Sequence, residues 1–169
     1  RALVVCRSNA YCDPRPSRMI DFLESSGYEV DLLHNITKSH IGENLQYEIH
    51  PRANTKTEKI RNKIFETISL LIVKVMPFIL DSLFEKYFFR YSTRSLDYYR
   101  SNYKVVVVES LEFLPFIIET KSSKSRIIFD AREYYPKQHE GEWFFDFFWS
   151  HVRHHFCKKY LLKCDHVIT

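Results

Sequence analysis

The sequence is poor in glycine, with only 3 among its 169 residues. Loops that wrap a phosphate are rich in glycine, because only glycine lets the backbone approach the phosphate closely. The polar loop after the first apolar run stands where a dinucleotide-binding fold carries Gly-x-Gly-x-x-Gly, and those glycines are absent from it. The sequence therefore argues against a glycine-rich phosphate loop.

Cysteine patterns that hold a metal or a disulfide framework are also lacking. The four cysteines are Cys6, Cys12, Cys157 and Cys164, and none belongs to a Cys-x-x-Cys pair. With no dense disulfide framework and no basic-then-apolar leader, a reduced, cytoplasmic setting is expected. His151 and His155 lie at helical spacing, but no zinc-protease pattern surrounds them and Arg153 would repel a cation. We therefore expect no metal site.

Long apolar runs and a strong charge imbalance are missing too. The apolar run from Ile68 to Leu80 is interrupted by Lys74 and Pro77, and it falls short of the roughly 18 residues that span a bilayer. The net charge of +4 is modest and comes with no aromatic-basic RNA-binding signature, so no nucleic-acid partner is expected. At 45% hydrophobic and 27% charged residues, the chain has the composition of one globular domain, residues 1–169.

What the sequence does contain is an alternation of short β-prone runs and helical periodicities. The predicted strands are 2–6, 28–33, 104–108, 126–130 and 164–169. The predicted helices are one from Met19 to a stop at Gly27, then 58–76, 78–89, 95–100, 111–120 and 142–163. Four or five strands alternating with helices predict an α/β fold with a Rossmann-like, doubly wound parallel sheet flanked by helices.

The segment 52–89 combines basic and apolar residues. Its apolar side chains recur at helical spacing, which predicts an amphipathic helix over 58–76: Ile60, Ile64, Phe65, Ile68, Leu71, Ile72 and Val75. Five basic residues against Glu58 lie at its start: Arg52, Lys56, Lys59, Arg61 and Lys63. One interpretation is a helix that packs on the core with a solvated basic flank. The alternative is contact with an anionic membrane surface through 52–89, at the inner face of the membrane.

Charged and polar residues follow three of the predicted strands. Because parallel strands share a direction, their carboxyl ends lie on one rim of the sheet, where ligands bind. The candidate binding residues are Arg7, Ser8, Asn9, Asp13, Arg15, Glu109, Ser110, Asp130, Arg132 and Glu133. No nucleophile with a dedicated base is evident, so no residue is assigned a catalytic role. The plainer interpretation of the first loop is a solvated turn in which Asp13 or Ser17 caps the next helix.

Several blocks, in this order, resemble the N-terminal domain of family-4-like glycosyltransferases of the GT-B fold. They are Leu3-Val4-Val5 with Asp13-Pro14-Arg15, Ser26-Gly27-Tyr28-Glu29-Val30, Val105 to Val108 with Leu114-Pro115, Ile127 to Pro136, and Cys164-Asp165-His166-Val167-Ile168-Thr169. Such domains commonly read Asp-Ala-His-Glu in the fourth block, where this chain has Asp130-Ala131-Arg132-Glu133. Residues 34–100 do not align with the family pattern.

The resemblance implies the acceptor-side half of an enzyme that transfers a sugar from a nucleotide-sugar to a glycan or a lipid-linked acceptor. The nucleotide-sugar is the donor substrate, no further cofactor is implied, and a C-terminal half carrying a Glu-x7-Glu segment binds it. The candidate residues above then line the cleft. Arg132 replaces a histidine that faces the donor sugar in relatives, which suggests contact with a phosphate or a carboxylated sugar, or an altered activity.

Both ends of the sequence suggest a piece of something longer, and the 169 residues alone are expected to be inactive. The alternatives are a non-catalytic Rossmann-like binding module and a flavodoxin-like domain that binds a small molecule.

Overall fold

The computed structural model describes residues 1–34, 46–48, 55–79, 103–120, 122–132, 135–137, 139 and 141–169. Within these residues, six strands form one sheet in the order β3-β2-β1-β4-β5-β6, and every neighbouring pair is parallel. The strands are β1 (Ala2–Val5), β2 (Val30–His34), β3 (Gln46–Glu48), β4 (Val105–Val108), β5 (Arg126–Asp130) and β6 (His166–Ile168). The predicted α/β class with a parallel sheet is confirmed.

The central strands are continuous apolar runs because both of their faces are covered. All four residues of β1 are buried, and β1 lies between β2 and β4 with Ala2 opposite Val30 and Val105. Alternate side chains enter two separate cores, since successive residues of a strand point to opposite faces. Leu3 and Val5 belong to one core, and Ala2 and Val4 belong to the other.

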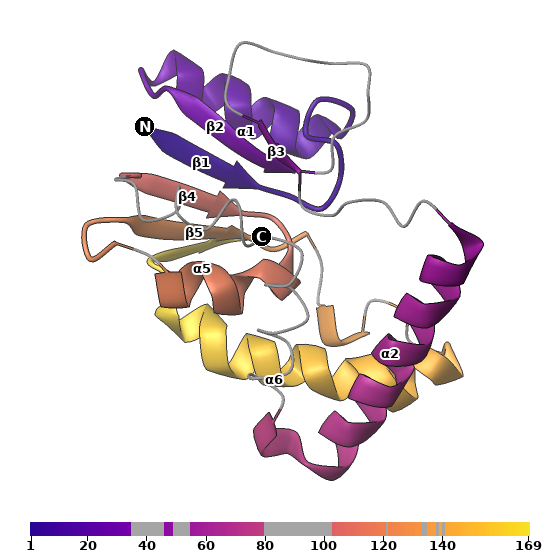
Figure 1. The fold of residues 1–169 in the computed structure, drawn as a ribbon. Coiled ribbons are helices and arrows are strands. Elements are labelled where there is room, and N and C mark those ends of the chain that lie inside the picture. Colours follow the sequence, from indigo (N-terminus) through magenta and orange to yellow (C-terminus); the bar gives the residue numbers. More distant parts are fainter. Residues whose placement is uncertain are drawn as a thin grey trace.

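Helices cover both faces of the sheet (Figure 1). Helix α1 (Pro14–Ser25) packs on one face through Ile20 and Leu23. Helices α5 (Leu114–Thr120) and α6 (Ser150–Tyr160) pack on the opposite face. The α6 side chains Val152, Phe156 and Tyr160 are all buried there.

Both ends of α1 follow from local chemistry. Asp13 is the N-cap, and its Oδ1 accepts a hydrogen bond from the backbone N–H of Arg15 (3.3 Å). Pro14 occupies the first turn, where its missing N–H costs no hydrogen bond. Gly27 ends the helix with φ 82°, a conformation that glycine adopts without steric cost. The predicted cap and the predicted glycine stop are both confirmed.

The structure differs from the sequence-based prediction at several elements. Helix α1 begins at Pro14, five residues before the predicted start at Met19, and the predicted helix 111–120 opens with a 3-10 turn, Leu111–Phe113. Strand β3 falls in a region for which no helix or strand was predicted. Its three residues, Gln46–Glu48, include two polar side chains and so form no apolar run that would indicate a strand. The predicted helix 142–163 contains a π-helical turn, Phe145–Trp149, ahead of α6 and ends in a 3-10 turn, Leu161–Lys163. The predicted helix 95–100 lies outside the described residues. So does most of 78–89, which begins within the 3-10 turn Pro77–Ile79.

Helix α2 (Lys56–Val75) is present as predicted, but its predicted apolar stripe does not pack on the core. Among the α2 side chains that the structure describes, Leu70 and Val73 are buried in the core. The seven apolar residues of the predicted stripe are instead exposed to solvent: Ile60, Ile64, Phe65, Ile68, Leu71, Ile72 and Val75. The core-packing interpretation of that stripe is therefore wrong, because helical periodicity identifies an apolar face but not its direction.

Candidate functional site

The three predicted strand ends meet where the strand order reverses. The chain runs outward from β1 through β2 to β3, and outward on the other side from β4 through β5 to β6. In open parallel sheets, ligands bind outside the carboxyl ends of the strands at such a reversal. Here the backbone N–H of Arg7, after β1, donates to Ser110 Oγ, after β4 (3.3 Å). The predicted convergence of these strand ends is confirmed.

Arg132, which follows β5, joins the three strand ends through two ion pairs. Its Nη1 lies 2.6 Å from Asp13 Oδ2, in the loop after β1, and its Nη2 pairs with Glu109 Oε2, at the end of β4. Ser8 Oγ also donates to Asp13 Oδ2 (2.9 Å). Burial alone would lower the pKa of Arg132, but Asp13 and Glu109 raise it above its usual value. The guanidinium therefore stays charged between the two carboxylates.

Glu109 is a buried carboxylate, and only one of its two oxygens has a hydrogen-bond partner among the described residues. The residue is 1% exposed, and its Oε1 has no hydrogen-bond partner in the described part of the chain. Burial raises the pKa of Glu109 above its usual value, although the Arg132 charge opposes that shift. Burial and the Glu109 charge also raise the pKa of the neighbouring Cys6 thiol to about 12, so this thiol is not a nucleophile at neutral pH.

Asp13 differs from Glu109 because it is more exposed and better bonded. Partial burial acts to raise its pKa, but the hydrogen bonds from Arg132, Ser8 and the Arg15 N–H hold the pKa below its usual value. The side chain is thus an anion at neutral pH, with three donors directed at it. It both caps α1 and neutralises Arg132.

The other predicted residues lie beside this cluster rather than in it. Arg15 Nη2 forms an ion pair with the buried Asp130 Oδ1 (2.8 Å). Asn9 turns back on its own loop, where its Oδ1 accepts from the Tyr11 N–H (3.1 Å). Glu133 lies outside the described residues. His34, which sequence analysis missed, holds the same loop to β2, since its Nδ1 accepts from the Ala10 N–H (3.2 Å).

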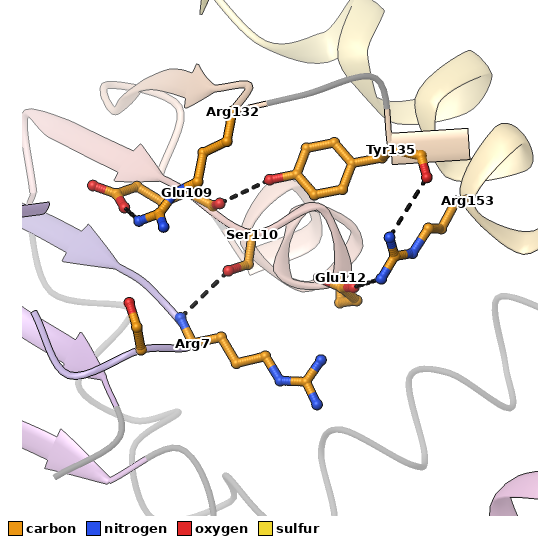
Figure 2. A pocket seen from close by; sticks show the side chains of 8 residues that line it. Arg7, Glu109, Ser110, Glu112, Arg132, Tyr135 and Arg153 are labelled. Carbon is orange, nitrogen blue, oxygen red and sulfur yellow. Dashed lines mark hydrogen bonds and ion pairs between the residues drawn. The ribbon is translucent and has the colours of Figure 1, made fainter. Parts of the chain in front are cut away.

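A cavity of about 320 Å³ opens beside the ion pairs (Figure 2). It is lined by Arg7, Ser8, Glu109, Ser110, Glu112, Arg132, Tyr135 and Arg153. Five of these eight are predicted site residues. Figure 2 shows the Arg132–Glu109 pair and the Arg153–Glu112 pair on either side of Tyr135.

Glu112, Tyr135 and Arg153 are the lining residues that sequence analysis did not identify. Arg153 Nη2 pairs with Glu112 Oε1 (3.2 Å), and Tyr135 Oη donates to the Glu109 carbonyl (2.9 Å). Glu112 and Tyr135 belong to the polar segments just past β4 and β5, so their place after a strand could have identified them as candidate site residues. Nothing in the sequence identifies Arg153, because it reaches the cavity from α6 through tertiary packing.

Each lining residue carries a polar or charged group, among them carboxylates that accept hydrogen bonds and guanidinium groups that donate them, while their carbon atoms form close to half of the lining surface. Such a cavity suits a ligand rich in hydroxyl groups rather than an apolar one. No group of three metal-ligating side chains occurs among the residues that the structure describes. No protein-family model matches the sequence, and no curated protein or solved structure shows significant similarity to it.

Proposed function

We propose that this chain is the acceptor-side half of a glycosyltransferase of the GT-B type, with a Rossmann-like fold. The observation that carries the proposal is the polar cavity at the reversal of strand order. Most small-molecule pockets are lined mainly by apolar side chains. Here all eight lining residues carry a hydrogen-bonding group, as recognition of a sugar requires.

The strand order also supports the proposal. The order 3-2-1-4-5-6 is that of doubly wound nucleotide-binding sheets, whereas flavodoxin-like domains have the order 2-1-3-4-5. Only β3 distinguishes the two strand orders. Without β3, the five remaining strands, renumbered along the chain, would have the flavodoxin-like order 2-1-3-4-5. Its pairing with β2, Leu32 opposite Gln46, favours the transferase-like half over the flavodoxin-like alternative.

Glu109 has the central role in this proposal. Its carboxylate pairs with Arg132 through Oε2 and so fixes the guanidinium in the wall of the cavity that receives the sugar. The Arg7 guanidinium, for which the described residues provide no ion pair, donates to the ligand from the exposed side of the cavity. The nucleotide-sugar is held mainly by the C-terminal half that the family resemblance implies, so transfer requires both halves.

The test is the substitution Glu109→Gln in the full-length protein, assayed with a panel of uridine, guanosine and thymidine diphosphate sugars. We expect transfer to fall at least about tenfold, because hydrogen bonds to a charged group contribute about 1.5–3 kcal/mol. Glu29→Gln is the matched control. Glu29 is exposed and pairs with Arg1 at the amino end of the sheet, away from the cavity at the carboxyl end. Unchanged kinetics for Glu109→Gln, or turnover by the 169 residues alone, would contradict the proposal.

One observation favours a second candidate, a non-catalytic binding half. Both terminal nitrogens of Arg132 are engaged by Asp13 and Glu109. A donor phosphate at this position would have to displace a carboxylate. If the full-length protein binds a glycan in the cavity without transferring sugar to it from any of these donors, the non-catalytic function is supported.

A further inference from the structure

Helix α2 presents an apolar face to solvent on the side away from the domain core. Leu70 and Val73 point into the core. At 100° per residue, the seven residues of the exposed stripe lie on the opposite side of the helix, within an arc of about 140°. Their exposed fractions range from 41% to 78%. The outward face of α2 is defined here as these seven residues, Ile60, Ile64, Phe65, Ile68, Leu71, Ile72 and Val75.

An exposed apolar face of this extent indicates a binding surface, because large contiguous apolar patches on a protein surface mark interaction sites. The patch continues past the end of α2 at Met76 and Phe78, which are also exposed. The π-helical turn brings Phe147 beside α2, where Lys74 Nζ lies over its ring. Helix α1 differs, since Phe22 is its one large hydrophobic side chain that is exposed in this way.

The charges of α2 indicate what kind of occupant fits. The helix carries five basic and two acidic residues, a net charge of +3. Lys56, Arg61 and Lys63 are exposed in its N-terminal half, alongside the apolar face. Basic residues flanking an apolar stripe complement anionic phospholipid, where long side chains reach the headgroups while the stripe enters the acyl boundary. A second copy of the chain would bring a helix with the same net positive charge rather than a complementary one.

The geometry fits a helix that lies in the plane of the interface. Among the helices that the structure describes, none is long and apolar enough to cross a membrane. We propose that the outward face of α2 docks on the surface of an anionic lipid bilayer. Figure 1 shows α2 on the side toward which the strand arrows point, so the docking surface lies on the same side of the domain as the carboxyl edge of the sheet. The inference does not depend on the chemistry of the cavity.

Co-sedimentation with vesicles tests the proposal. The two probes are vesicles of phosphatidylcholine alone and of equimolar phosphatidylcholine and phosphatidylglycerol. We expect the partition coefficient to be at least about tenfold higher for the anionic vesicles, since each exposed basic residue near such a surface contributes to binding. Little binding to either vesicle, or equal binding to both, would overturn the proposal.

Variants place the contact on α2. The double substitution Ile64→Glu/Ile68→Glu should reduce binding to anionic vesicles at least about tenfold, because it puts two carboxylates into the apolar face. Phe22→Glu on α1 is the matched control and should leave binding unchanged. Circular dichroism verifies that each variant is folded. Vesicle binding that survives the double substitution overturns the proposal. So does self-association of the protein that the double substitution abolishes, if there is no vesicle binding, because the occupant is then a second copy.

Discussion

Two buried carboxylates lie at opposite ends of the sheet, and each is paired with an arginine. Asp31, near the amino end of β2, is 1% exposed and lies 2.8 Å from Arg1 Nη2. Glu109, just past the carboxyl end of β4, is also 1% exposed and pairs with Arg132. By burial and by partner type the two sites are alike.

They differ in how many of their hydrogen bonds are made. Asp31 has both oxygens engaged, because Arg1 donates to Oδ1 (2.9 Å) and the Tyr103 hydroxyl donates to Oδ2 (2.7 Å). Glu109 Oε1 is buried and has no hydrogen-bond partner in the described part of the chain, and the residue itself lines a cavity. Buried polar groups are normally satisfied, so an unsatisfied one calls for an explanation. Burial of a charge alone does not mark a candidate site, whereas an unsatisfied carboxylate in a residue that lines a cavity does.

The largest expected effect comes from removing Arg132. Arg132→Ala leaves Glu109 buried without its counter-charge, and breaking a buried pair from one side costs about 3–5 kcal/mol. Urea denaturation at pH 7 measures the loss in the free energy of unfolding. The second substitution Glu109→Gln should restore a large part of that loss, because it removes the stranded charge. A double variant as unstable as Arg132→Ala would show that the ion pair is not the cause.

The ion-pair cluster also shows how far sequence reasoning reaches. The apolar runs of β1, β4 and β5 predicted a parallel sheet, and the shared strand direction then predicted that Arg7, Glu109 and Arg132 would converge. The order of the strands was not predictable, because β3 has no apolar run to mark it. The direction of the α2 stripe was not predictable either, since periodicity is the same whether an apolar face points inward or outward.

The partners of the site residues were beyond sequence reasoning for a related reason. Arg132 was predicted to face a ligand, and nothing local showed that Asp13 and Glu109 would occupy its terminal nitrogens. Arg153 belongs to α6, which is far along the chain from the other lining residues. Nothing in the sequence therefore shows that it lies next to them in space. Residue type and strand direction locate a site, whereas pairing within the site depends on tertiary distances of a few ångströms.

At the amino end of the sheet, an intermediate effect is expected from Tyr103→Phe. This substitution removes one donor to the buried Asp31 while Arg1 remains, and a hydrogen bond to a charged group contributes about 1.5–3 kcal/mol. The free energy of unfolding should fall by that amount, with no effect on ligand binding at the cavity. Tyr28→Phe is the control, because Tyr28 packs against the other core and its hydroxyl makes no hydrogen bond with the described residues. Equal losses for the two variants would contradict the assignment.

The smallest effect is expected from Asp13→Asn, and it should depend on pH. The amide still caps α1, so the loss is that of a partly exposed ion pair with Arg132, about 1 kcal/mol at pH 7. Because folding lowers the pKa of Asp13 below its usual value of 3.8, its stabilising contribution is present above that value and is lost as the pH falls through the lower, folded value. Denaturation midpoints of the two proteins should therefore converge in acid. A gap that stays constant with pH would mean that the Asp13 charge does not stabilise the cluster around Arg132.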